Sequence, residues 1–187
     1  MTQSNESTFI GIDLGGSTLK GALVDNAGEI VQEIRQDTEH ESAAALVKQL
    51  AEAVRSLGAH RHARNVGAIG IGIPGLVNRQ TNRVELMPNL PSLAELDITA
   101  ELAREAGLPV ILDNDANAAA YGELQAGAAR GRHDVFFVTL GTGIGAGLII
   151  GGRIYRGAAG FAGEFGHMTI DPEGIECVCG NIGCLET

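Results

Sequence analysis

Residues 9–24 read FIGIDLGGSTLKGALV, with an apolar run on either side of the turn at residues 15–17. Each run is short, rich in branched side chains and bounded by turn residues, so we expect strands over 9–13 and 19–24. Another turn leads into a third expected strand, from residue 29 to about 35. The chain therefore begins as a three-strand meander.

Helix signals follow the meander. Residues 42–57 carry leucine and valine at helical spacing, with Gly58 in the position of a C-terminal cap. The same kind of signal predicts a buried strand over 66–73, a short helix over 99–106 that Gly107 stops, and a strand over 110–112. This order predicts an α/β fold whose mixed sheet carries helices on its faces.

The opening pattern returns later in the chain. After an expected alanine-rich helix over residues 116 to about 129, a strand that starts near Val135 ends in residues 139–143, TLGTG, which echo residues 13–17, DLGGS. A second strand follows each turn. The echo suggests two related lobes, an N-terminal α/β lobe over 1–115 and the beginning of a C-terminal lobe over 116–187.

Residues 135–152 contain no charged side chain and raise the alternative of a membrane span. Six of them are glycines, each costing about 1 kcal/mol in a helix interior relative to alanine. A strand, turn and strand is therefore expected here. Residues 1–8 are polar and show no export signal, so we expect a cytoplasmic protein with no membrane partner.

The composition narrows the kinds of molecule that the protein is expected to bind. The 187 residues are 44% hydrophobic but only 4% aromatic, so the core is expected to be aliphatic. A net charge of −10 argues against a nucleic-acid surface, which needs a concentrated cationic face. The one basic cluster, residues 55–64, is explained more simply by a solvated loop.

The two glycine turns have the chemistry of a polyphosphate site, because glycine leaves backbone N–H groups open to a ligand and nearby hydroxyls add donors. An aspartate beside the first turn can hold Mg²⁺ through its water shell. Either turn alone would be explained more simply by an ordinary β-hairpin, and the repetition favours binding. The candidate residues are Asp13, Gly15, Gly16, Ser17, Thr18, Gly141, Thr142 and Gly143.

Residues 113–117 place two carboxylates and two amides between the expected strand 110–112 and the next helix. One of them is expected to cap the helix, but four exceed what a cap needs. A carboxylate here can accept the proton of a hydroxyl that attacks phosphorus. Rigid turns lie at residues 73–75 and 88–91, where Asn89 suits either a polar ligand or, more simply, an Asx-turn.

The C-terminal segment offers one imidazole and three thiols, from His167, Cys177, Cys179 and Cys184. Four such ligands predict a closed tetrahedral Zn²⁺ site, which is structural because no position is left for water. A disulfide plus a free thiol is the alternative. An odd number of cysteines and no secretory signal favour zinc.

These motifs together resemble the ROK family of bacterial sugar kinases and sugar-responsive repressors. The resemblance runs from Phe9 to Thr187, and the patterns over 160–167 and 184–187 look most like the glucokinases. The motifs that carry it are residues 13–17, 113–117, 141–145, 164–167 and 177–186.

The resemblance implies an actin-like ATPase (ribonuclease H-like) fold, with a complete first lobe and a partial second lobe around a cleft. It implies an ATP- and Mg²⁺-dependent transfer to the 6-hydroxyl of glucose, with Asp115 as the base and structural zinc shaping the sugar pocket. The ATP phosphates would lie on the two glycine turns. The sugar-binding residues it implies are Gly75, Asn89, Asn114, Glu164, His167 and Glu186.

Family members continue well beyond the position of Thr187, so we expect the chain to end within its second lobe. Related enzymes are often dimers, so a homodimer is also expected. The alternatives are a kinase for another hexose such as N-acetylmannosamine or fructose, a sugar-sensing regulator, and an inactive truncated fragment. The regulators carry a DNA-binding module ahead of the first glycine turn, whereas eight residues precede Phe9 here.

Overall fold

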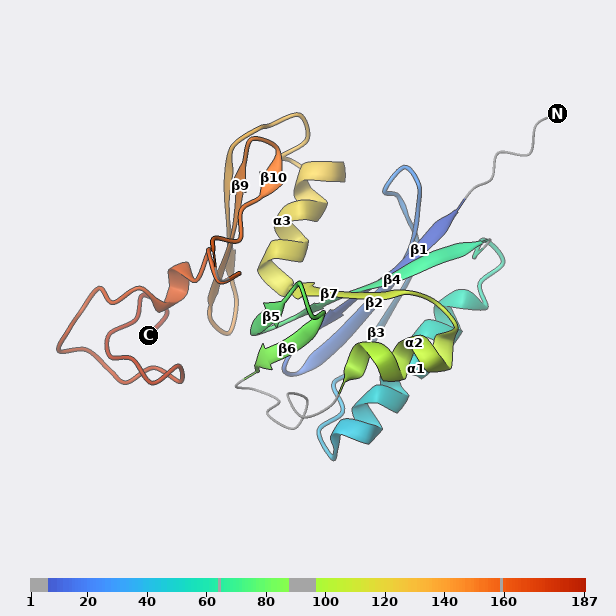
Figure 1. The fold of residues 1–187 in the computed structure, drawn as a ribbon, viewed down its shortest axis with the longest axis horizontal. Coiled ribbons are helices and arrows are strands. Elements are labelled where there is room, and N and C mark those ends of the chain that lie inside the picture. Colours follow the sequence, from blue (N-terminus) through green and yellow to red (C-terminus); the bar gives the residue numbers. More distant parts are fainter. Residues whose placement is uncertain (1–6, 64, 88–96, 159) are drawn as a thin grey trace. The chain divides into compact units, whose positions relative to one another are not determined.

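The computed structural model describes residues 7–63, 65–87, 97–158 and 160–187. The chain forms two compact units, Met1–Asp115 and Ala116–Thr187 (Figure 1). Asn89, one of the expected sugar-binding residues, lies outside the described residues. Within the described ranges, no helix is long and apolar enough to cross a membrane.

A five-stranded mixed sheet in the order β3-β2-β1-β4-β7 forms the centre of the first unit. The β2 strand pairs antiparallel with β1 and β3, whereas β1, β4 and β7 run parallel. The expected meander and mixed sheet are confirmed. The strands are β1 (Thr8–Leu14), β2 (Thr18–Asp25), β3 (Ile30–Asp37), β4 (Val66–Ile73) and β7 (Val110–Asn114).

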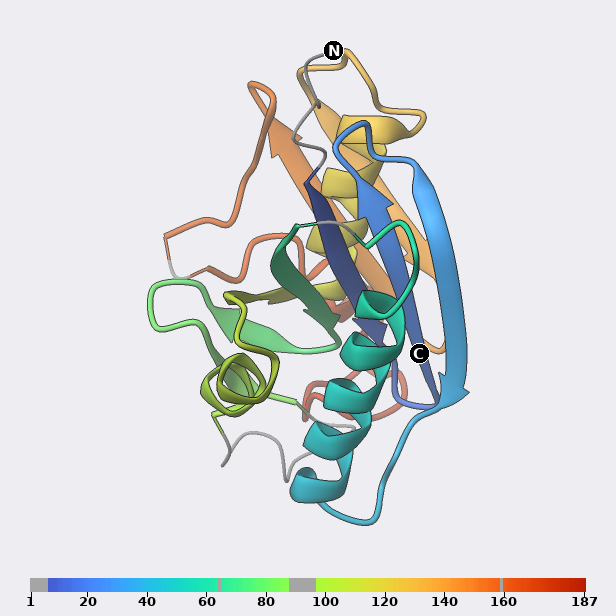
Figure 2. The same cartoon turned by 90° about the vertical axis from the view of Figure 1, so that its right-hand side faces the viewer.

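Two helices cover one face of this sheet (Figure 2). The first, α1 (Ala43–Gly58), begins after Ser42, whose hydroxyl accepts from the Ala45 N–H at 3.1 Å. The expectation that Gly58 caps this helix is wrong, because Gly58 is its last residue and Ala59 is the cap. The second, α2 (Ile98–Ala106), ends as expected at Gly107, which has φ 66°.

The core of the first unit lies between the helices and the sheet. Along β1 the side chains alternate, so that Ile10 and Leu14 are buried while Phe9, on the other face, is 42% exposed. Leu50 and Leu57 of α1 face this core and are fully buried. Each fully buried aliphatic side chain contributes about 1.5–3 kcal/mol relative to exposure, so packing rather than propensity holds α1 in place.

A two-stranded hairpin between β4 and α2, formed by β5 (Leu76–Asn78) and β6 (Arg83–Leu86), is absent from the expected order of elements. Its strands are too short to show a readable alternation. The turn of the hairpin is tied to β7, because the Asn82 side chain donates to the Val110 carbonyl at 2.8 Å and accepts from the Leu112 N–H at 2.9 Å. The hairpin therefore supports the strand that leads to residues 113–117.

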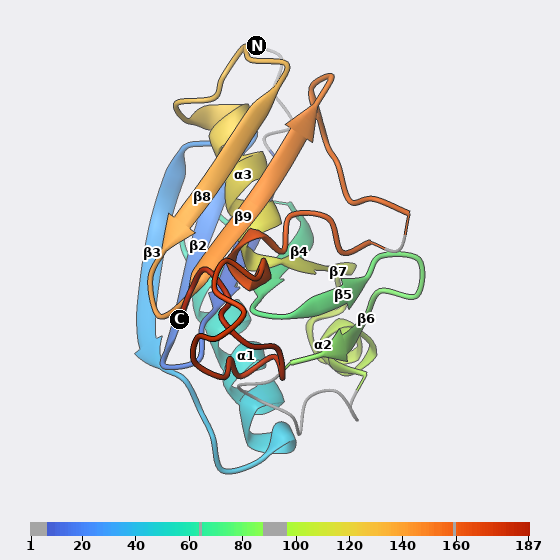
Figure 3. The same cartoon turned by 90° about the vertical axis from the view of Figure 1, so that its left-hand side faces the viewer.

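The second unit packs a helix on a three-stranded antiparallel sheet of order β10-β9-β8 (Figure 3). Gly147 of β9 allows a close approach, because an added Cβ would lie 2.5 Å from the Cβ of Ala120 and 3.0 Å from the carbonyl oxygen of Ala116. The elements are α3 (Asp115–Ala126), β8 (Val135–Leu140), β9 (Ile144–Ile150), β10 (Arg153–Ile154) and the short 3₁₀ helix η2 (Phe165–His167).

Candidate active site and metal centre

Four expected site residues gather at one edge of the first unit's sheet, where the parallel strands β1, β4 and β7 end. Asp13 on β1 lies in register with Gly72 on β4, shortly before Gly75. The side-chain nitrogen of Asn114 donates to the carbonyl oxygen of Gly75 at 3.2 Å, and Asp115 follows as the first residue of α3. Open α/β sheets bind ligands outside this edge.

The strand before the acidic run is longer than expected. It was predicted to end at Leu112, but Asp113 and Asn114 continue β7, in parallel register with Gly72 and Ile73 of β4. Apolar patterning ends at Leu112, whereas backbone pairing continues for two residues. Asp115 is therefore the first residue beyond the sheet edge.

The first glycine turn is held from both sides by backbone and hydroxyl hydrogen bonds. The Gly15 N–H donates to the Thr18 carbonyl at 2.9 Å. Thr38, just after β3, donates its hydroxyl to the Gly15 carbonyl at 2.8 Å and its N–H to the Ser17 carbonyl at 3.0 Å. Thr38 was not among the residues predicted from the sequence. Its contacts fix the turn that carries Gly16, Ser17 and Thr18.

Asp13 has a cationic neighbour, Lys20, that was not predicted from the sequence. The Lys20 ammonium lies 3.2 Å from Oδ2 of Asp13, and each side chain is about half exposed, 56% and 53%. The two residues are cross-strand partners in the β1–β2 hairpin, which the turn at 15–17 could have predicted. Any Mg²⁺ that Asp13 holds must therefore compete with Lys20 for this carboxylate.

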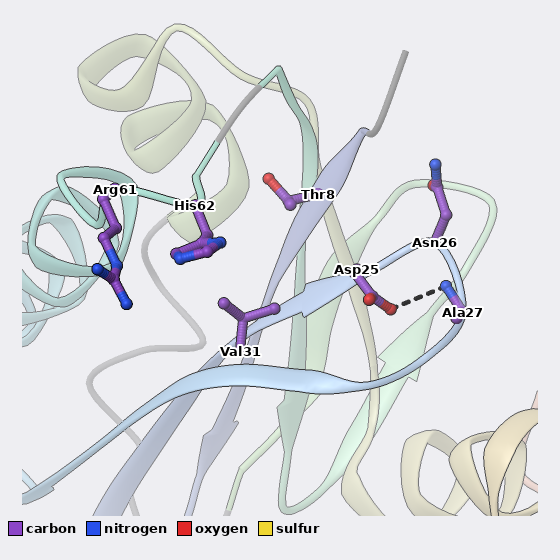
Figure 4. Close-up of a pocket in the computed structure, with 7 residues that line it drawn as sticks. All are labelled: Thr8, Asp25, Asn26, Ala27, Val31, Arg61 and His62. Carbon is purple, nitrogen blue, oxygen red and sulfur yellow. Dashed lines mark hydrogen bonds between the residues drawn. The ribbon is translucent and has the colours of Figure 1, made fainter. Parts of the chain in front are cut away.

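A pocket of about 570 Å³ opens at the other end of β1 (Figure 4). The Asp25 side chain in it serves local structure, since its Oδ1 accepts from the N–H groups of Ala27 at 2.8 Å and Glu29 at 3.0 Å. None of the expected site residues that the structure describes lines it. The lining residues are Thr8, Asp25, Asn26, Ala27, Val31, Arg61 and His62.

The second glycine turn joins β8 to β9. The Gly141 N–H donates to the Gly143 carbonyl at 3.0 Å, and the Ile144 N–H donates to Oε2 of Glu186 at 3.2 Å. Gly141 has a negative φ, and an added Cβ would meet no atom within 4 Å. No described neighbour of Gly141 within the second unit therefore requires glycine there, which fits a position kept small for a ligand. Thr142, beside it, is exposed.

Two glycines allow η2 to pack closely against β9. A methyl group on Gly166 would overlap the Ile144 carbonyl, and one on Gly163 would lie 2.8 Å from the Ala146 carbonyl oxygen. This contact brings Glu164, which precedes η2, and His167, the last residue of η2, close to the start of β9. Nε2 of His167 lies 3.9 Å from Oε2 of Glu164, so this ring nitrogen faces the carboxylate.

The four expected zinc ligands form one cluster. The ligand atoms of His167, Cys177, Cys179 and Cys184 all lie within 4.8 Å of one another. The two sulfurs of Cys179 and Cys184 are 3.7 Å apart, and Nδ1 of His167 is 3.6 Å from the Cys177 sulfur. A tetrahedral Zn²⁺ requires separations of about 3.8 Å between sulfurs and about 3.5 Å between sulfur and nitrogen. The donor set fits zinc in its chemistry, and these two separations match tetrahedral spacing.

The backbone of the loop is folded around this cluster. The Cys177 N–H donates to the Asn181 carbonyl at 2.8 Å, and the Gly180 N–H donates to the Cys177 carbonyl at 2.9 Å. The Cys184 sulfur lies 3.5 Å from the His167 carbonyl oxygen. Among the described residues, all three cysteines are free thiols, so the disulfide alternative has no support in this structure.

The three thiols differ in their pKa. The Asn181 N–H lowers the pKa of Cys179, whereas burial raises that of Cys184. For Cys177, the Cys179 N–H lowers the pKa, but burial and hydrogen bonds, including that to Glu186, outweigh it and raise the pKa to about 12. Thiolate ligation at Cys177 and Cys184 therefore releases protons when metal binds.

The sequence matches the ROK family over residues 9–187. A glucokinase from Halalkalibacterium halodurans is 40% identical over 183 residues, which cover 96% of this chain and 55% of that protein. The xylose repressor of Bacillus subtilis is 37% identical over 179 residues, covering 95% of this chain and 46% of that protein. The chain thus spans about half the length of the curated relatives it matches.

Comparison with solved structures also finds proteins of the ROK family. The crystal structure of a ROK family glucokinase from Streptomyces griseus in complex with glucose and AMPPNP matches with a TM-score of 0.86 and 38% identity. The match covers 96% of this chain and 56% of that one. A ROK hexokinase from Thermus thermophilus matches with a TM-score of 0.81 and 36% identity, over 96% of this chain and 59% of that one. The expected actin-like ATPase fold is confirmed.

Proposed function

The chain belongs to the ROK family, and on that premise we propose that its protein transfers the γ-phosphoryl group of ATP to the 6-hydroxyl of a hexose, with glucose as the preferred sugar. The observation that carries the proposal is the sheet edge of the first unit, where Asn114 contacts Gly75 and Asp115 follows directly. A carboxylate at this edge lies where α/β sheets bind small ligands.

Asp115 is the proposed base. Its carboxylate would accept the proton of the sugar hydroxyl as that oxygen attacks phosphorus. In a loose phosphoryl-transfer transition state the bond from the sugar oxygen to phosphorus is scarcely formed, so the hydroxyl still holds its proton. The base therefore positions the hydroxyl and takes its proton late. Asn114 and Gly75 would hold neighbouring hydroxyls, as the family resemblance implies.

The glycine turns are the proposed phosphate-binding elements, one in each unit. The Gly15 and Gly141 N–H groups bond within the turns. The other N–H groups of the turns and the hydroxyls of Ser17, Thr18 and Thr142 would donate to phosphate oxygens. The open space at Gly141 supports this role. Asp13 would hold Mg²⁺ through water, with Lys20 released from its ion pair to face the phosphates.

The second unit would supply further sugar contacts from Glu164, His167 and Glu186. Zn²⁺, when bound by His167 and the three cysteines, would supply structural support and no chemical step. Nδ1 of His167 faces the Cys177 sulfur, which leaves Nε2 on the side of Glu164 for a sugar hydroxyl. A ligand on Nδ1 also fixes the tautomer, with the proton on Nε2 as a donor.

The test is turnover with a panel of sugars. The chain is incubated with Mg²⁺-ATP and glucose, mannose, fructose, allose or N-acetylmannosamine, and ADP and sugar phosphate are measured. We expect turnover with glucose to exceed that with the other sugars. Preferential turnover of another hexose would overturn the choice of glucose, and absence of turnover with every sugar would overturn the kinase proposal.

A sugar-responsive regulator is the second candidate, and the 37% identity to a xylose repressor is the observation that favours it. Calorimetry separates the two proposals. A regulator binds sugar without consuming ATP, whereas a kinase couples sugar binding to ADP release. Xylose binding in the absence of any ATP turnover would favour the regulator.

A further inference from the structure

We propose that Glu186 is a positioning residue that links the metal-binding loop to the second glycine turn, residues 141–144, so that metal occupancy controls the order of that turn. The proposal rests on the proposed function in one respect only, which is the role of the turn as a phosphate-binding site. The link itself is carried by contacts within the second unit, and each of its two ends is supported by separate contacts.

One carboxylate oxygen of Glu186 contacts the turn. Oε2 accepts the Ile144 N–H at 3.2 Å, which ties down the residue that follows the turn. A methyl group on Gly143 would overlap the same oxygen. The carboxylate therefore occupies the space that a side chain at 143 would take, and glycine there is explained by Glu186.

The other oxygen contacts the metal-ligand cluster. Oε1 lies 3.2 Å from the Cys177 sulfur and 3.4 Å from Nδ1 of His167. A bound Zn²⁺ would take the Cys177 thiol proton and occupy Nδ1, so neither group would remain a hydrogen-bond donor to Oε1, but it would fix both ligand atoms and with them the loop in which Glu186 follows Cys184. Metal occupancy is thereby transmitted to the position of Glu186.

The Glu186 backbone is fixed as well. Its N–H donates to the Gly166 carbonyl at 3.0 Å, and the Leu185 N–H donates to the Met168 carbonyl at 2.9 Å. The side chain is only 13% exposed. Gly166 in turn lies against the Ile144 carbonyl, so Glu186 and Ile144 are joined through both side chain and backbone. Such a connected network transmits a change at one end to the other.

Hydrogen exchange at the Ile144 amide tests the link without any need for sugar or ATP. In zinc-loaded protein, we expect Glu186→Ala to speed exchange at Ile144 about tenfold or more, as loss of its acceptor requires. Glu186→Gln keeps an acceptor oxygen and should retain most of the protection. Glu173→Ala, which removes an exposed carboxylate from the same loop, is the matched control and should change nothing.

The second part of the experiment varies the zinc content of the wild-type protein. Removing zinc from the wild-type chain with a chelator should speed exchange at Ile144 by a similar factor, and added zinc should restore it. Unchanged exchange in either Glu186→Ala or the metal-free wild type would overturn the proposal. If Glu186 served only as a sugar ligand, glucose rather than zinc would protect Ile144, and that outcome would overturn it too. Failure of the kinase proposal would leave these readouts unaffected.

Discussion

The side-chain nitrogen of Asn114 donates to the carbonyl oxygen of Gly75 at 3.2 Å, joining the end of β7 to the turn that follows β4. The two residues are 39 positions apart in sequence and meet because β4 and β7 are parallel neighbours. This contact fixes the backbone immediately before Asp115. The position of the proposed base is thus set by the sheet.

Removing the Asn114 amide tests that dependence. Asn114→Ala should lower the free energy of unfolding by about 1 kcal/mol through loss of a partly buried hydrogen bond. It should also raise KM for the sugar, because the neighbouring contacts lose their positioning. Denaturant titration and steady-state kinetics measure the two effects. Gln80→Ala, at an exposed position, is the control, and an equal loss in the control would remove the special role of Asn114.

Gly141→Ala separates a phosphate role from a structural one. Because an added Cβ meets nothing within 4 Å and the backbone has a negative φ, stability should stay within about 0.5 kcal/mol of wild type. The methyl group would nevertheless stand between backbone N–H groups and a polyphosphate, so KM for ATP should rise severalfold. Thermal unfolding and ATP kinetics are the readouts. An unchanged KM would count against phosphate binding at this turn.

Two glycine substitutions in the second unit should change the free energy of unfolding in opposite directions. Gly147→Ala forces a methyl group against Ala120 and the Ala116 carbonyl, and should destabilise by about 1–3 kcal/mol. Gly122→Ala, in the interior of α3 with open space around it, should stabilise by about 0.5–1 kcal/mol through helix propensity. Urea unfolding of both variants checks the packing of α3 on β9, and equal effects would contradict it.

Asp97 gives the fold an acid-sensitive cap. The Thr99 hydroxyl, the Ala100 N–H and Arg83 all lower the pKa of this carboxyl group. Its folded pKa therefore lies below the unfolded value of about 3.9, so its stabilisation is present above about pH 4 and is lost as pH falls through the folded pKa.

Replacing Asp97 by asparagine should keep the N-cap and remove this dependence, because asparagine caps helices as well as aspartate does. Unfolding midpoints between about pH 2.5 and 6 should fall less steeply for Asp97→Asn than for the wild type. Glu52→Gln, an exposed carboxylate on α1, is the control. Parallel pH profiles for wild type and Asp97→Asn would show that the lowered pKa is not linked to folding.

Much of the first unit could be predicted from local pattern. The β1–β2–β3 meander and the strand over 66–73 follow from short apolar runs between turn residues, and α2 ends at Gly107 as expected. The β5–β6 hairpin and the last two residues of β7 could not be predicted, because each depends on pairing with a distant segment. Local patterning carries no information about such partners.

The site residues, too, divide into those that local sequence predicts and those that it does not. The four metal ligands were predictable because they lie within one short segment of chemically matched residues. Thr38 and the contact between Glu186 and Ile144 were not, since each joins residues more than 20 positions apart through a backbone group. Lys20 could have been found from the register of a hairpin centred on residues 15–17.

Turnover by Asp115→Asn tests the central proposal most directly, with Asp113→Asn as the matched control two residues earlier on the same edge. We predict that Asp115→Asn lowers kcat with ATP and glucose by a factor of at least about 100, while calorimetry shows glucose bound as in the wild type. Asp113→Asn should stay within about tenfold of the wild type. Wild-type kcat in Asp115→Asn would contradict the assignment of Asp115 as the base.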